Sequence, residues 1–118
     1  PLAEALLKKL RPDLEVESAG LHVAIPISEE AKKYLAREDA TRYLKKTPEN
    51  LNNKQVNEYD LIVAMEQRHK NAIMIRCPEC ENKIVVWNVE DPYFLPSKEA
   101  EKVYRQIKEK VAELARSL

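Results

Sequence analysis

Hydrophobic and polar residues follow different periods in successive parts of the chain. The apolar positions of residues 2–10 lie three or four residues apart, which predicts an amphipathic helix whose buried face consists of Leu2, Leu6, Leu7 and Leu10. Residues 14–18 instead alternate apolar and charged positions before Ala19 and Gly20, which predicts a short strand that enters a turn. The pattern therefore predicts a helix followed by a strand.

Capping residues and helical spacing predict three further helices. Ser28 can cap a helix that extends to about Arg37, and Thr47 followed by Pro48 is typical of another helix start. Ser97 can cap a long C-terminal helix with an alternating Lys/Glu face that we expect to be solvated. The opposite, apolar face of that helix contains Ala100, Val103, Tyr104, Ile107, Val111, Leu114 and Leu118.

Two segments, residues 59–65 and 83–88, contain nearly continuous apolar residues. Such runs are typical of parallel strands that are buried on both faces, and the helical patterns between strands are long enough for right-handed βαβ crossovers. We therefore expect a single domain over residues 1–118, of the α/β class, with a doubly wound parallel sheet and helices on both faces.

Charge and composition narrow the range of partners. The 118 residues include 20 Lys and Arg and 20 Asp and Glu, with a sequence pI near 7.2, so no basic surface for nucleic acid or for an anionic membrane is expected. Apolar runs such as residues 61–65 are far too short to span a bilayer, and we expect a cytoplasmic protein. Abundant Lys and Glu with little Gln is a bias of proteins from heat-loving organisms.

The two cysteines form the sequence Cys77-Pro78-Glu79-Cys80. A Cys-x-x-Cys pair can supply half of a zinc site or a redox pair, and His69 lies eight residues before Cys77. Because no fourth ligand is evident, we expect no metal and favour free thiols or a disulfide on an exposed loop. We expect His69 and His22 to be surface residues.

Four segments occur in an order and spacing that resemble a known family: residues 1–5, 16–20, 59–66 and 89–94. They are similar to the low-molecular-weight protein tyrosine phosphatases, over essentially the whole chain. The resemblance implies a three-layer, flavodoxin-like doubly wound parallel sheet. It also implies hydrolysis of phosphotyrosine or small aryl phosphates through a cysteinyl-phosphate intermediate, with inorganic phosphate as the other ligand and without a cofactor.

In that family a strand and a Cys-x5-Arg-Ser loop directly precede the proline that starts the first helix. The residue six positions after Cys77 is Lys83, and the residue six positions after Cys80 is Val86, so neither cysteine starts such a loop. We therefore expect these 118 residues to lack the nucleophile, the arginine and the central first strand, which would lie between residues 14–18 and 59–65. On this expectation the domain is incomplete at its N-terminus and inactive by itself.

The resemblance assigns roles to residues that are present. The resemblance implies Asp91 as the general acid, and Pro92 confines Asp91 to an extended conformation; the alternative is a surface Asp-Pro turn. Tyr93 and Phe94 are implied as the walls of the site, although Phe94 could instead pack in the core. Ser18 is implied to support the phosphate loop, or else it caps a local turn.

Other matches are weaker. The N-terminal turn of the helix after Pro1 can face a phosphate. Arg42 matches a family arginine, but Asp39 stands where the family often has histidine. Two alternative functions remain open: an arsenate reductase of the same fold, for which Cys77 and Cys80 would be the extra cysteine pair, and a non-catalytic phosphatase-like binding domain.

Overall fold

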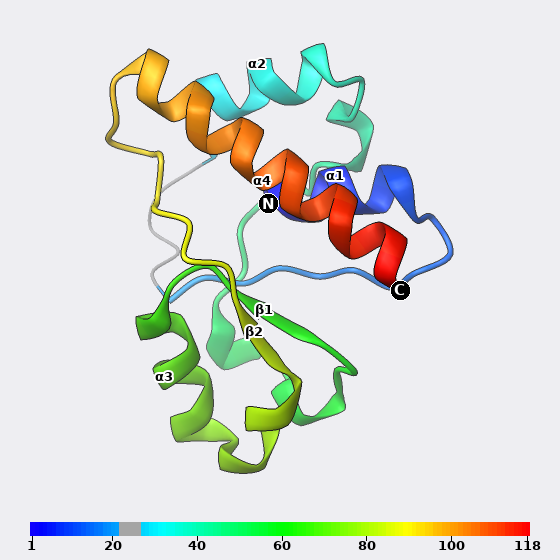
Figure 1. Cartoon of the computed structure of the whole chain (residues 1–118), viewed down its shortest axis with the longest axis vertical. Helices are drawn as coiled ribbons and strands as arrows, with labels where there is room; N and C mark the ends of the chain where they lie inside the picture. The colour runs from blue at the N-terminus through cyan, green and yellow to red at the C-terminus, as the bar shows by residue number, and fades with distance from the viewer. Residues whose placement is uncertain (22–26) are drawn as a thin grey trace. The chain divides into compact units, whose positions relative to one another are not determined.

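The computed structural model describes residues 1–21 and 27–118, and these residues form two compact units (Figure 1). Residues 1–51 and 91–118 form the first unit and contain helices α1 (Leu2–Leu10), α2 (Glu29–Arg37) and α4 (Ser97–Ser117). Residues 52–90 form the second unit and contain β1 (Ile62–Ala64), α3 (Gln67–Arg76) and β2 (Ile84–Val86). Short 3₁₀ helices connect these elements: η1 (Thr41–Tyr43), η2 (Leu51–Asn53), η3 (Val56–Glu58) and η4 (Pro78–Lys83).

The core of the first unit lies where α4 packs against α1 and α2, as Figure 1 shows. The apolar faces predicted for α1 and α4 are buried over most of their length, while Leu10 and Leu118, at the ends of the two helices, are exposed. The rings of Tyr34 and Tyr104 contact each other at a tilt of 51°, with their centroids 5.3 Å apart. Burial of its apolar stripe accounts for much of the stability of the 9-residue α1, because isolated helices shorter than about 12–15 residues are marginal.

Helix α2 begins and ends where its sequence predicts. The Ser28 hydroxyl accepts a hydrogen bond from the Ala31 N–H at 3.1 Å, which satisfies one of the free donors of the first turn. Asp39, just beyond the helix, has a φ of 55°, and the Ala40 N–H donates to the Leu35 carbonyl at 2.9 Å. A left-handed residue of this kind closes the last turn, and an aspartate tolerates that conformation better than most residues.

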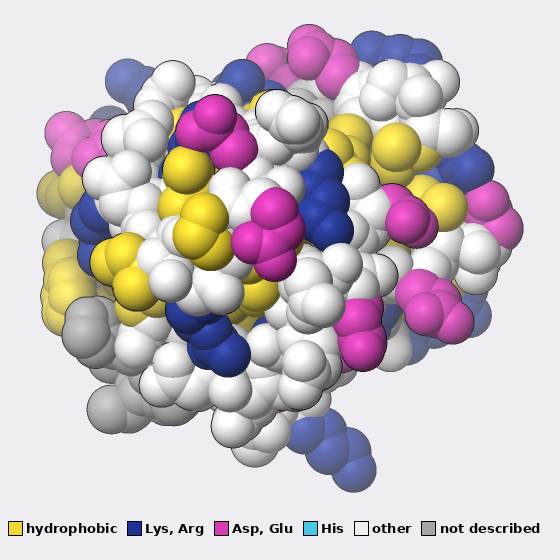
Figure 2. Space-filling view, turned by 90° about the horizontal axis from the view of Figure 1, so that it is seen from below, with side chains coloured by type: hydrophobic (Ala, Val, Ile, Leu, Met, Phe, Trp, Pro, Cys, Tyr) yellow, Lys and Arg dark blue, Asp and Glu magenta, His cyan; other side chains and the backbone are white. Residues whose placement is uncertain are grey.

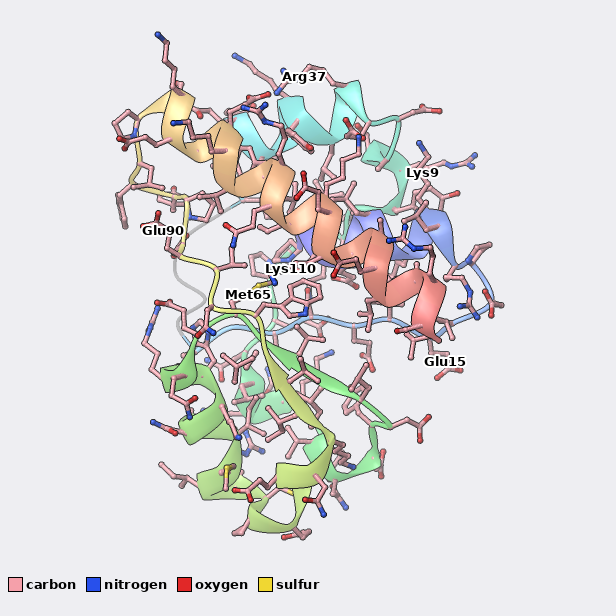
Figure 3. All side chains as sticks on the ribbon, in the orientation of Figure 1. Lys9, Glu15, Arg37, Met65, Glu90 and Lys110 are labelled. Carbon is pink, nitrogen blue, oxygen red and sulfur yellow. A yellow bond between two sulfur atoms is a disulfide. The ribbon has the colours of Figure 1, made fainter. Side chains whose placement is uncertain are left out.

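Helix α4 begins one residue away from its predicted cap. Ser97 is the first residue of the helix and does not cap it; its hydroxyl donates to Glu30 Oε1 at 2.8 Å. The preceding residue, Pro96, takes the cap position without a side-chain hydrogen bond. Arg37, labelled in Figure 3, reaches from α2 to the Glu101 carboxylate on α4 at 2.8 Å, so the two helices also share an exposed ion pair.

The second unit is a β–α–β arrangement. Strands β1 and β2 are parallel, with Ile62 opposite Ile84, and α3 and η4 connect them, which confirms the predicted parallel pairing and the α/β class. Each strand is three residues long, shorter than predicted, but backbone bonds continue beyond it: the Trp87 N–H donates to Ala64 at 2.9 Å and the Val89 N–H to Met65 at 2.8 Å. Asn88 interrupts the ladder with a φ of 56°.

Two predicted elements are wrong. Residues 14–18 are not a strand, because a strand is defined by ladder bonds and the described residues offer this segment none. Residues after Thr47 do not start a helix either. The Glu49 carbonyl accepts from the Gly20 N–H and the Leu51 N–H donates to the Gly20 carbonyl, both at 2.9 Å, so this backbone is held extended by a single parallel bridge.

The cysteines form a disulfide, but the expectation of an exposed loop is wrong. Cys77 and Cys80 are 2% and 1% exposed and lie at the junction of α3 and η4, where the Cys80 N–H donates to the Cys77 carbonyl. His69 is partly buried rather than free on the surface, because its Nδ1 accepts from the Glu66 N–H at 3.1 Å and closes the first turn of α3. His22 lies outside the described residues.

Charges of both signs are interspersed among apolar side chains on the face drawn in Figure 2. Within the described residues, no group of three or more His, Cys, Asp or Glu side chains is placed to hold a metal ion. None of the helices described here combines the length and apolar character needed to cross a membrane.

Candidate active site

Asp91, Pro92, Tyr93 and Phe94 form an exposed turn that leads into α4. The Asp91 carboxylate is oriented by the backbone two residues further on, because its Oδ1 accepts a hydrogen bond from the Tyr93 N–H at 3.0 Å. The Leu95 N–H donates to the Pro92 carbonyl at 3.1 Å and closes the following turn. The second carboxylate oxygen takes no hydrogen bond from the described residues, so it is available to another group.

The two aromatic rings of this turn contact each other. Their centroids are 4.9 Å apart and the ring planes meet at 70°, an edge-to-face arrangement. Tyr93 is 37% exposed and Phe94 is 81% exposed, so the alternative in which Phe94 packs in the core is wrong. The turn thus presents a carboxylate and an exposed pair of rings within four residues.

Ser18 lies beside the N-terminal turn of α1. Its hydroxyl donates to Glu4 Oε1 at 2.6 Å, so it does not simply cap a local turn. Glu4 is a buried acidic residue of that first turn, and the Lys8 ammonium contacts its other oxygen, Oε2, at 2.8 Å. An acidic side chain near a helix N-terminus also interacts favourably with the helix dipole.

Lys45 completes this cluster from the other side. Its Nζ donates to the Ser18 carbonyl at 2.6 Å and lies 3.6 Å from Glu4 Oε1 and 3.4 Å from Glu49 Oε1. Burial opposes ionisation of Glu4 most strongly. The hydrogen bonds from Lys8 and Ser18 and the charges of Lys45 and Lys8 together outweigh burial, so the pKa of Glu4 lies below its ordinary value.

The sequence did not predict the Glu4 cluster. The Glu4 and Lys8 side chains stand four residues apart on one helix, a spacing that is visible in the sequence and typical of helix ion pairs. The approach of Lys45 is not visible, because this residue is distant in sequence and follows a short 3₁₀ helix. Arg42, which the resemblance singles out, places its guanidinium 4.9 Å over the ring of its neighbour Tyr43.

Comparison with known proteins identifies the family of the chain. The model of the family described as low molecular weight phosphotyrosine protein phosphatase matches residues 1–118. The chain belongs to this family. Within the low molecular weight phosphatase family, a protein-tyrosine-phosphatase of Salmonella typhi, Wzb, is 30% identical over 126 residues, which span 100% of this chain and 85% of that protein. Wzb of Escherichia coli K12 is 32% identical over 107 residues, 79% of this chain and 69% of that protein.

Solved structures confirm the expected fold. The low molecular weight protein tyrosine phosphatase from T. tengcongensis superposes with a TM-score of 0.84 at 26% identity, covering 100% of this chain and 90% of that one. Vibrio vulnificus Wzb, solved with benzylphosphonate, superposes with a TM-score of 0.86 at 24% identity, covering 100% of this chain and 89% of that one, and this likeness shows the fold alone. The α/β, flavodoxin-like architecture of the low molecular weight phosphatases is therefore also that of this protein.

Proposed function

We propose that this low molecular weight phosphatase hydrolyses phosphotyrosine and small aryl phosphates, and that inorganic phosphate binds in the same site. One observation carries the proposal: the Asp91 carboxylate stands next to an exposed pair of aromatic rings, Tyr93 and Phe94. Such rings can flank the aryl group of a substrate while the carboxyl group donates a proton to the oxygen that leaves with the aryl group. Benzylphosphonate, the ligand of the Vibrio vulnificus relative, also joins an aromatic ring to a phosphorus oxyanion.

The proposed reaction has two steps. A cysteine thiolate attacks phosphorus, an S–P bond forms, the P–O bond to the aryl group breaks, and Asp91 donates its proton to the leaving oxygen. Asp91 then takes a proton from water, whose oxygen attacks phosphorus and breaks the S–P bond. The products are the phenol, inorganic phosphate and the regenerated thiolate. General acid and base catalysis of this kind contributes about 10²- to 10⁴-fold.

Neither cysteine of these 118 residues suits the role of nucleophile. Cys77 and Cys80 are buried and joined in a disulfide, and neither is followed six residues later by an arginine. The proposed reaction therefore takes its cysteine and arginine from a Cys-x5-Arg-Ser segment outside this sequence, placed so that the N-terminal turn of α1 and Ser18 support the phosphate. We propose that the 118 residues are inactive without that segment.

The alternative functions gain no support from the structure. An arsenate reductase would need the cysteine pair to be reachable by a reaction partner, whereas both sulfur atoms are buried. A phosphatase-like binding domain would keep the exposed rings but show no turnover. The following experiment measures turnover and so distinguishes such a domain from an enzyme.

The experiment compares these 118 residues with an extended protein, in which a family-type strand and a Cys-x5-Arg-Ser segment precede Pro1. We expect only the extended protein to hydrolyse an aryl phosphate. In it, Phe94→Ala should lower kcat/KM about ten-fold for an aryl phosphate and little for an alkyl phosphate, as expected for a lost ring contact. The matched control is Ile75→Ala, which removes another exposed apolar side chain. Equal losses for both substrates, or turnover by the 118 residues alone, would contradict the proposal.

A further inference from the structure

The hydrogen bonds around Ser18 restrict what its hydroxyl can do. A serine hydroxyl has one proton to donate and two lone pairs that accept. Its proton is directed to Glu4 Oε1 at 2.6 Å, and the shortness of this bond fits a hydroxyl that donates to a carboxylate. Towards any third group, the Ser18 oxygen can therefore act only as an acceptor.

Lys45 contacts both residues of the hydrogen bond between Ser18 and Glu4. Its side chain is 13% exposed, and its ammonium contacts the Ser18 carbonyl at 2.6 Å and the Glu4 carboxylate at 3.6 Å. One residue thus fixes the backbone of Ser18 and supplies part of the charge that keeps Glu4 ionised. Glu49, 3.4 Å from the same ammonium, belongs to the segment that bridges Gly20, so the contact also links residues 18–20 to residues 45–50.

Direct phosphate binding by Lys45 does not fit this geometry. An ammonium group has three N–H bonds, and three oxygen atoms already surround this one: the Ser18 carbonyl, Glu4 Oε1 and Glu49 Oε1. An exposed lysine would be able to turn towards an anion. A nearly buried lysine with three oxygen neighbours instead determines where those neighbours lie.

We propose that Lys45 is a positioning residue for the phosphatase reaction, acting through Glu4 and Ser18. This inference rests on the proposed function. Lys45 keeps the Ser18 oxygen in place beside the first turn of α1 as a hydrogen-bond acceptor for the N–H groups of the phosphate-binding segment. Without Lys45 the Ser18 carbonyl loses this donor, Glu4 loses the cation 3.6 Å from its Oε1, and the hydroxyl is free to turn away.

The test uses kcat and KM of the extended protein with an aryl phosphate. Lys45→Met keeps the length of the side chain but removes its charge, and Lys46→Met is the matched control because Lys46 is exposed and directly adjacent. We expect Lys45→Met to lower kcat by about 10- to 100-fold and to change KM less than kcat, since small displacements of a positioned group cost up to about 10²-fold. Lys46→Met should leave both constants unchanged.

Two further variants separate positioning from general destabilisation. Lys45→Arg retains the charge and should recover most of kcat. In a Ser18→Ala background, Lys45→Met should cause less than about a two-fold additional loss, because residues that act through one another are not additive. Full additivity in that background, no recovery by Lys45→Arg, or equal kcat for Lys45→Met and Lys46→Met would overturn the proposal.

If the extended protein shows no turnover, the proposed function itself is refuted. Binding of inorganic phosphate then provides a second readout for Lys45. The dissociation constant of phosphate, measured by calorimetry on the extended protein and its variants, tests the positioning role of Lys45. We expect Lys45→Met to weaken phosphate binding at least five-fold relative to Lys46→Met. Equal affinities, or no phosphate binding by the unmodified extended protein, would overturn the positioning role.

Discussion

Replacing Glu4 by glutamine tests whether the buried cluster stabilises the first unit. Glutamine keeps the volume of the side chain and an acceptor for the Ser18 hydroxyl, but it removes the negative charge that faces Lys8 and Lys45. The Glu4 side chain is 4% exposed, and its oxygen atoms lie 2.8 Å and 3.6 Å from the two ammonium groups. The substitution therefore leaves two cations near an uncharged amide.

The loss in the free energy of unfolding depends on how far the Lys8 and Lys45 ammonium groups can be solvated once the charge of Glu4 is removed. Breaking a fully buried pair costs about 3–5 kcal/mol, and a hydrogen bond to a charged group contributes about 1.5–3 kcal/mol. The Lys8 side chain is partly exposed and can be solvated, and Lys45 keeps the Ser18 carbonyl and Glu49. We therefore expect Glu4→Gln to lower the free energy of unfolding by about 2–3 kcal/mol, between the exposed and the fully buried case.

The matched control is Glu29→Gln. Glu29 also lies in the first turn of a helix and also has a lysine partner, Lys32 at 3.4 Å, but its side chain is 81% exposed. Because exposed pairs contribute little, this variant should stay within about 0.5 kcal/mol of the unmodified protein. Urea denaturation at pH 7, followed by far-ultraviolet circular dichroism, measures both variants.

The pH dependence supplies a second check. The pKa of Glu4 is lower in the folded protein than its ordinary value of 4.5, so its ionised form stabilises the fold. That contribution is fully present above pH 4.5 and is lost as pH falls through the folded-state pKa. The gap between the unmodified protein and Glu4→Gln should therefore shrink in acid. A gap that is independent of pH, or equal losses for Glu4→Gln and Glu29→Gln, would refute this reasoning.

Three further predictions concern packing, backbone conformation and the disulfide. Leu35→Ala should lower the free energy of unfolding by about 2–5 kcal/mol, because Leu35 is fully buried, whereas Ile75→Ala should change it by less than about 0.5 kcal/mol; urea denaturation measures both. Asp39→Gly should raise the midpoint of thermal unfolding, because glycine adopts a φ of 55° without the penalty of a side chain; an unchanged or lower midpoint would contradict this. Reduction of the Cys77–Cys80 disulfide should destabilise residues 52–90 by about 2 kcal/mol, since the loop it closes is very short, and hydrogen exchange should show faster opening there than in α4.

Local features of the sequence predicted helices α1, α2 and α4 well and the strands less well. Helix α2 follows from Ser28 and the apolar positions after it, all of which act within one helix. The segment 14–18 alternates as a strand does, but strand formation depends on a partner distant in sequence, and the described residues provide none. The helix expected after Thr47 is absent because the Glu49 carbonyl accepts a hydrogen bond from the Gly20 N–H. No local sequence pattern predicts this contact.

The residues of the candidate site also differ in how far the sequence predicted them. Asp91, Tyr93 and Phe94 lie within four residues, so the sequence indicated both the carboxylate and the rings, and the structure adds that Phe94 is exposed. The partner of the Ser18 hydroxyl could not be predicted, because Glu4 lies on another element and depends on Lys45 for part of its charge balance. Burial of the cysteine pair likewise depends on how η4 packs, which spacing alone does not reveal.

Leaving-group dependence tests the role of Asp91 most directly. The measurement is kcat/KM of the extended protein, its Asp91→Asn variant and a Glu90→Gln control, with two aryl phosphates whose phenols differ in acidity. Asp91→Asn should slow the substrate with the less acidic phenol by about 10²- to 10⁴-fold and the other much less, because a proton matters most to the poorer leaving group. Glu90→Gln should behave as the unmodified protein does. Equal slowing of both substrates by Asp91→Asn would contradict the assignment of Asp91 as the general acid.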